Sequence, residues 1–116
     1  QSAFAVTISQ PTSASVEDLL TAYINAWKAG QFGAAQGDTL RFDAPVTTGR
    51  LGTEPLSSVH FAYTDRATNT PGERTTWFAR HRDFALQMEA FSVPGKAAPP
   101  RAATTNAIVN SVKFLT

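Results

Sequence analysis

The chain has 116 residues, the size of one domain, and with 42% hydrophobic and 16% charged residues it is neither disordered nor highly charged. Its net charge of +1 gives no reason to expect a nucleic-acid partner. Without cysteine it has neither disulfides nor thiolate metal sites, and no apolar run approaches the roughly 18 residues of a membrane-spanning segment. We therefore expect one folded domain covering residues 1–116.

The first two predicted elements are a strand and a helix. Phe4, Val6 and Ile8 alternate with other residues, which predicts a short strand with these three side chains on one face. A helix follows, with Ser15 as its N-cap and Gly30 as the residue that ends it. Large apolar residues recur along this helix at spacings of three and four and form one stripe: Val16, Leu19, Leu20, Tyr23 and Trp27. The stripe predicts that one face of the helix packs on the core.

Alternating apolar and polar residues in the middle of the chain predict a sheet. The segments 56–64, 73–80 and 84–93 alternate and follow one another closely, which favours antiparallel strands. A weaker alternating segment, 39–43, precedes them, and 47–52 is predicted as a turn because it contains two glycines. With the first strand, these segments make a sheet of five strands.

The last predicted element is a helix from Arg101 onward, after a linker rich in proline, glycine and alanine. Its apolar face carries Ile108, Val112 and Leu115. The predicted order of elements is therefore β-α-β-β-β-β-α. An antiparallel β-sheet packed with two helices predicts an α+β fold of two layers.

Residues 81–83 spell HRD, the triplet of the protein-kinase catalytic loop. In kinases an Asn five residues after the Asp holds a metal ion, and Met88 occupies that position here. The sequence also lacks the glycine-rich loop and the DFG motif of kinases. We therefore interpret Arg80 to Asp83 as a polar turn between two strands. Its three basic side chains leave a docking patch for an acidic partner as the alternative to a solvated turn.

No other pattern predicts a catalytic, metal or cofactor site. The two histidines, His60 and His81, lack the spacing of metal ligands. A triad assembled from Ser57, His60 and Asp65 lacks the GxSxG context of a nucleophilic serine. The carboxylates form no paired pattern, and no glycine-rich phosphate-binding motif occurs. We expect no catalytic residues, no metal ion and no cofactor.

Aromatic residues of the predicted sheet suggest a contact surface. Trp77 and Phe78 are neighbours on one strand, so their side chains lie on opposite faces. If the second face of the sheet is open, it carries an exposed apolar patch of the kind that binds partners. The alternative is that the linker or an N-terminal extension covers this face. The predicted binding residues are Trp77, Phe78 and Phe91 on the sheet, with Arg80 and Arg82 at its basic tip.

Five segments follow one another along nearly the whole chain: FAVTIS, SVEDLLTAYINAW, PLSSVHFAYTDR, GERTTWFARHRDFALQMEAF and TTNAIVNSVKFL. Their order and spacing resemble the PsbP-like superfamily, and the stretch from Ile108 to Phe114 is similar to the terminal helix of that group. The group includes a photosystem II extrinsic protein, a Ran-binding import factor, DcrB-type envelope lipoproteins and chaperones of type VI secretion effectors. Its members usually begin with a hairpin that would precede the first residue here.

This resemblance implies a non-enzymatic domain that binds a protein partner through its surface, as members of the group do. No contact residue is carried over as a motif. Lysine is scarce while alanine, threonine and serine are plentiful, a bias that we associate with an exported bacterial protein. We therefore expect an extracytoplasmic location: periplasmic, secreted or anchored to the envelope as a lipoprotein. Pairing of an edge strand between two chains would give a homo-oligomer.

A second resemblance leads to a different function. The stretch TAYINAWKAGQFGAA is similar to the first helix of the cone-like fold of nuclear transport factor 2 and ketosteroid isomerase. This alternative implies a small-ligand binding protein or an enzyme, with Tyr23 and Trp27 lining a pocket between helix and sheet. Asp43 or His60 would supply its acid or base. In the cone fold, helices come first and strands usually come last.

Overall fold

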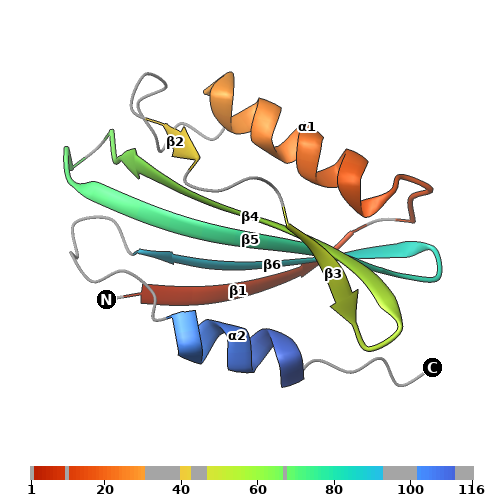
Figure 1. Ribbon diagram of the computed structural model, residues 1–116. Helices are drawn as coiled ribbons and strands as arrows, with labels where there is room; N and C mark the ends of the chain where they lie inside the picture. Colours follow the sequence, from red (N-terminus) through yellow and green to blue (C-terminus); the bar gives the residue numbers. More distant parts are fainter. Residues whose placement is uncertain are drawn as a thin grey trace.

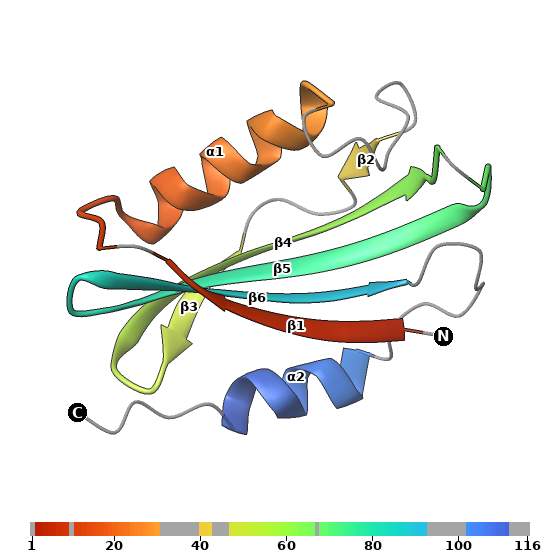
Figure 2. The same ribbon diagram turned by 180° about the vertical axis from the view of Figure 1, so that it is seen from behind.

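The computed structural model describes residues 2–9, 11–30, 40–42, 47–66, 68–92 and 102–111. Six strands in these ranges form one antiparallel sheet in the order β1-β6-β5-β4-β2, with β3 also paired to β4. The strands are β1 (Ser2–Ile8), β2 (Arg41–Phe42), β3 (Thr47–Leu51), β4 (Glu54–Thr64), β5 (Pro71–His81) and β6 (Phe84–Ser92). The helices are α1 (Val16–Lys28) and α2 (Ala102–Ser111), and they lie on opposite faces of the sheet (Figures 1 and 2).

The α+β class and the antiparallel sheet are confirmed, but the expected two layers are wrong. The structure has three layers, because the sheet lies between α1 and α2 (Figure 1). The prediction of a turn over 47–52 is also wrong for most of that segment. Residues 47–51 form β3, which pairs with β4, and only Gly52, with φ 62°, keeps the expected turn conformation. Burial of Leu51, which is 4% exposed, favours the strand over the local preference of the glycines.

The first core lies between α1 and the sheet. Ser15 caps α1 as predicted, because its Oγ accepts a hydrogen bond from the backbone N–H of Asp18 at 3.0 Å. The stripe of α1 packs against alternate residues of β4 and against Phe78 of β5, so one face of each element is buried. The core residues are Val16, Leu20, Tyr23, Trp27, Val59, Phe61, Tyr63 and Phe78. Full burial of each large apolar side chain contributes about 1.5–3 kcal/mol.

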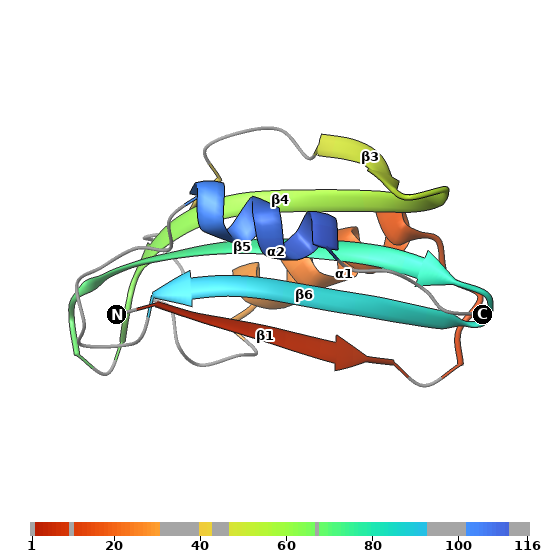
Figure 3. The same cartoon turned by 90° about the horizontal axis from the view of Figure 1, so that it is seen from below.

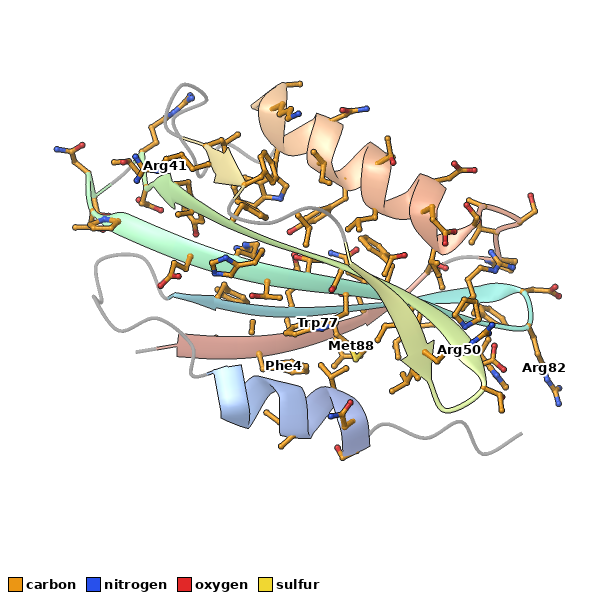
Figure 4. The ribbon with its side chains drawn as sticks, in the orientation of Figure 1. Phe4, Arg41, Arg50, Trp77, Arg82 and Met88 are labelled. Atoms are coloured by element: carbon orange, nitrogen blue, oxygen red, sulfur yellow. The ribbon has the colours of Figure 1, made fainter. Side chains whose placement is uncertain are left out.

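The second core lies on the face of the sheet that α2 covers. Its centre is Trp77, whose ring lies 6.2 Å from that of Phe4, beside the fully buried Met88. Figure 4 shows these three side chains together on the α2 side of the sheet. The buried members are Leu51, Trp77, Ala79, Leu86, Met88, Ala90 and Val109. The second face is therefore covered at Trp77, and it is α2 that covers it.

Helix α2 presents a different side to the core than its sequence pattern predicts. Ile108 was expected on the buried face, but it is 37% exposed, whereas its neighbour Val109 is 2% exposed. Val112 and Leu115, the other residues of the predicted face, lie outside the described residues. Successive helix residues differ by about 100° around the axis, so a change of one position turns a different stripe toward the sheet.

Candidate functional site

The HRD triplet lies where strand β5 turns into β6. Strand β5 ends at His81 and β6 begins at Phe84, so Arg82 and Asp83 form the turn and the predicted hairpin is confirmed. Arg82 has φ 55°, a left-handed conformation that L-residues adopt at some cost. Its side chain is exposed and extends away from the sheet at the tip of the turn (Figure 4).

Arg80 has a structural role beside this turn. One guanidinium nitrogen, Nη1, donates to the carbonyl of Ala14 at 2.6 Å, and Nη2 donates to the carbonyl of Arg82 at 2.9 Å. The backbone N–H of Thr12 donates to the carbonyl of Asp83 at 2.7 Å in the same region. The bonds of Ala14 and Thr12 attach the segment before α1 to the β5–β6 hairpin, and the bond from Arg80 to Arg82 lies within the hairpin. Arg80 therefore fixes the position of the helix relative to the hairpin.

The structure does not bring the five predicted binding residues together. Trp77 is 6% exposed under α2, and Phe78 is 5% exposed under α1. Phe91 is half-buried on the α1 face, where the guanidinium carbon of Arg74 lies 4.5 Å from its ring centroid. It lies at the opposite end of β6 from Arg82. No single surface therefore contains all five side chains.

A different group of apolar side chains is exposed on the α2 face. Val6 is 54% exposed, Ile8 69% and Phe84 46%. In the sheet register Val6 lies opposite Met88 and Ile8 lies opposite Leu86. Since alternate residues of β6 share a face, Phe84 lies on the same face as these pairs. We call Val6, Ile8 and Phe84 the edge strip.

The edge strip borders the outer side of strand β1. Strand β1 is the last strand of the sheet, and no other described strand pairs with its outer side. Figure 3 shows α2 lying over β5, so that it leaves β1 uncovered at the edge. The sequence SAFAVTI contains no charge and no proline, which are the residues that commonly protect such edges. The strip and the edge together form an open apolar surface.

The backbone N–H and C=O groups of β1 point alternately toward β6 and away from it. The N–H of Ser9 donates to the carbonyl of Ala85 at 2.9 Å, and the register places these two residues opposite each other. In an antiparallel ladder every second residue makes such bonds, so the odd-numbered residues of β1 bond to β6. The N–H and C=O groups of Phe4, Val6 and Ile8 therefore point outward.

A polar cluster lies beneath α1. The Tyr23 hydroxyl donates to Glu89 Oε1 at 2.6 Å and accepts a hydrogen bond from Thr76 Oγ1 at 2.9 Å. Arg74 Nη1 donates to the same carboxylate oxygen at 3.0 Å, and its guanidinium carbon lies 5.0 Å from the ring centroid of Trp27. Burial raises the pKa of Tyr23 well above its ordinary value, and the hydrogen bond to Glu89 raises it further. We call Tyr23, Arg74, Thr76 and Glu89 the Tyr23 cluster.

The Tyr23 cluster holds α1 against β5 and β6. Tyr23 stays protonated and acts as a donor, so it is not an activated base or nucleophile. Glu89 accepts bonds from three groups on two elements, Tyr23 of α1 and Arg74 and Thr76 of β5, and its side chain is only 15% exposed. The residues come from distant parts of the chain with no common motif, and sequence reasoning identified none of them as a group. The arrangement supports a structural role.

The pocket of the cone-like alternative is not formed as expected. Tyr23 and Trp27 lie in the first core, where the Trp27 ring centroid is 5.0 Å from that of Phe61. His60 lies on the other face of β4, with its Nε2 3.1 Å from Glu73 Oε1. Asp43 lies outside the described residues. His60 therefore cannot serve as the acid or base of a pocket lined by Tyr23.

The serine triad considered from sequence is also separated. Ser57 and His60 are three positions apart on β4, and strand alternation places them on opposite faces. Ser57 is fully buried. Among the described ranges, no three carboxylate or histidine side chains are grouped to hold a metal ion. Neither described helix has the length and apolar character needed to cross a membrane.

Within the described residues, the geometry therefore offers an open apolar surface, the edge strip with the outer edge of β1, and an interior polar cluster around Tyr23. Comparison of the sequence with protein-family models and with curated proteins gave no match.

Proposed function

We propose that this chain is a non-enzymatic protein-binding domain that acts through surface contacts. The contact surface in this proposal is the edge strip together with the outer edge of β1. The observation that supports it is the exposure of Val6, Ile8 and Phe84 beside a strand edge without charge or proline. Exposed apolar groups of this kind mark interaction surfaces, and free strand edges accept further strands.

The exposed fractions of the three side chains set the binding free energy that they can contribute. Val6, Ile8 and Phe84 keep about half of their surface in water. If a partner covered them, their burial would contribute about 2–5 kcal/mol before the costs of association. That is too little for tight binding by the side chains alone. The backbone groups of the edge are therefore part of the proposed contact.

The wider setting of the proposal comes from the sequence. We propose membership of the PsbP-like superfamily from the order and spacing of the segments, whose known members act by protein contact. We also propose that the chain belongs to an exported bacterial protein and works outside the cytoplasm, on its composition rich in alanine, threonine and serine. In this proposal the chain needs no cofactor and carries out no reaction.

Position-specific photo-crosslinking tests the contact surface. A photoreactive residue at Ile8 should give a discrete crosslinked species in cells of the source organism. The matched control places it at Thr21, which is exposed on α1 on the other side of the sheet. A second substitution, Val6→Lys, should abolish the crosslink at position 8. Equal crosslinking at both positions, or none at position 8, would contradict the proposed surface.

A further inference from the structure

We infer that the partner on this surface is a second copy of the chain, joined by antiparallel pairing of β1 with β1 about a two-fold axis. The inference rests on the proposed contact surface and adds the identity of the occupant. It follows from the backbone, from the side chains and from the charge of the strand.

The backbone of β1 is self-complementary, and one register pairs Phe4, Val6 and Ile8 with the same three residues of a second copy. The outward N–H and C=O groups belong to even-numbered residues, so paired positions must both be even. A two-fold axis at Val6 pairs Val6 with Val6 of the second copy, and Phe4 with Ile8 of the second copy. Each such pair exchanges two N–H···O bonds, giving about six in all. The outward groups of these three residues are then all satisfied.

The side chains fit the same register. An axis perpendicular to the sheet keeps the α2 faces of both copies on one side, so Phe4, Val6 and Ile8 meet only apolar side chains. Ile8, the most exposed large apolar residue of the described chain, lies against the ring of Phe4 of the second copy. On the other face, the small residues Ala5 and Thr7 meet each other. Cross-strand pairs of aromatic and β-branched residues are among the favourable ones.

Charge favours a second copy over a charged partner. Strand β1 has no ionisable side chain, and the whole chain carries a net charge of only +1, so two copies repel each other weakly. The edge best accepts an uncharged strand with large apolar residues at every second position, and β1 is such a strand. One strand pair buries less than the roughly 800 Å² per partner of a standard interface, so the dimer should be weak and in the micromolar range.

Single cysteines test the register, because the chain has no cysteine of its own. Residues paired on the axis have Cα atoms about 5.5 Å apart, within the range of a disulfide. Val6→Cys should therefore form a disulfide-linked dimer under mild oxidation. Ile8→Cys is the matched control, since its two copies would lie about 14 Å apart along the strands. Position 8 is the more exposed of the two. Disulfides formed by random collision would therefore appear faster at position 8 than at position 6.

Sedimentation velocity of the unmodified chain provides the second test. The sedimentation coefficient should rise toward that of a dimer between low micromolar and near-millimolar concentration. Val6→Lys places two ammonium groups opposite each other and should weaken association at least about tenfold. Thr21→Lys adds the same charge on α1 and should leave association unchanged. Circular dichroism of both variants establishes that the fold is retained.

Three results would overturn the inference. They are a monomer at every concentration, equal weakening by Thr21→Lys, and oxidation of Ile8→Cys at least as fast as that of Val6→Cys. The proposed function has a separate test, because it requires only that position 8 crosslinks to some protein. A crosslink from position 8 to a different protein, with a monomer in sedimentation, would leave the contact surface in place and exclude the second copy.

Discussion

Replacing Tyr23 with Phe removes one oxygen atom from the Tyr23 cluster. That hydroxyl donates to Glu89 at 2.6 Å and accepts from the fully buried Thr76 at 2.9 Å. A hydrogen bond to a charged group contributes about 1.5–3 kcal/mol. Arg74 still binds Glu89 in the variant, and Thr76 lies 3.4 Å from the same oxygen, so part of the loss is recovered. We expect the free energy of unfolding to fall by about 2 kcal/mol.

Urea denaturation followed by tryptophan fluorescence measures this loss, because Trp27 and Trp77 report on the two cores. The matched control is Tyr63→Phe, the same substitution at the other tyrosine. The Tyr63 hydroxyl makes no hydrogen bond with another described residue, so this variant should lose less than about 0.5 kcal/mol. Equal losses for the two variants would refute the role assigned to the Tyr23 hydroxyl.

The pH dependence of the free energy of unfolding gives an independent check on the Tyr23 hydroxyl. Burial raises the pKa of Tyr23 in the folded protein above the value of about 10 in the unfolded chain. The folded state therefore holds this proton more tightly, and its stabilisation is fully present below pH 10 and is lost as the pH rises through the folded pKa. The stability difference between the parent chain and Tyr23→Phe should shrink above about pH 10, by up to about 1.4 kcal/mol per pH unit. A difference that stays constant to the alkaline limit would contradict this reasoning.

Three further substitutions test other parts of the fold by thermal or urea unfolding. Arg80→Ala removes the bond that joins Arg80 to Ala14 before α1 and the bond that joins Arg80 to Arg82 within the hairpin, and it should cost about 1–2 kcal/mol; an unchanged midpoint would show that these bonds contribute nothing. Gly72→Ala places a Cβ 2.7 Å from the ring of Tyr63 and should destabilise the fold by about 1–3 kcal/mol. The control is Gly49→Ala, whose Cβ meets nothing within 4 Å. Similar losses for the two alanine variants would argue against a clash at Gly72. Arg82→Gly removes the steric cost of the positive φ of 55° and should be neutral or stabilising by up to about 1 kcal/mol. A clear loss of stability would mean that the Arg82 side chain supports the turn.

The elements predicted best from sequence are those fixed by local signals. The cap at Ser15, the apolar stripe and the stop at Gly30 define α1, and the two-residue turn at Arg82 defines the β5–β6 hairpin. Strand β3 was missed because Gly49 within it and Gly52 after it indicate a turn, while its pairing with β4 depends on residues further along the chain. Neighbouring residues carry no information on such a partner.

The candidate surface depends even more on long-range contacts. The pattern of β1 placed Val6 and Ile8 on one face but did not show that the strand lies at the edge of the sheet. That position follows from pairing with β6, at the other end of the sequence. Either Trp77 or Phe78 was expected to face away from the helices, because the fold was predicted to have two layers. The packing of α2 against the second face buries Trp77.

The position of β1 also has a consequence for how the protein folds. Strands β4, β5 and β6 are neighbours in sequence, so their hairpins close short loops and form early. Strand β1 is synthesised first, yet its partner β6 ends at Ser92, so the pair closes a loop of most of the chain. During synthesis β1 therefore stays unpaired until β6 has also left the ribosome. The edge surface is then among the last parts to form, and only a fully folded chain presents it.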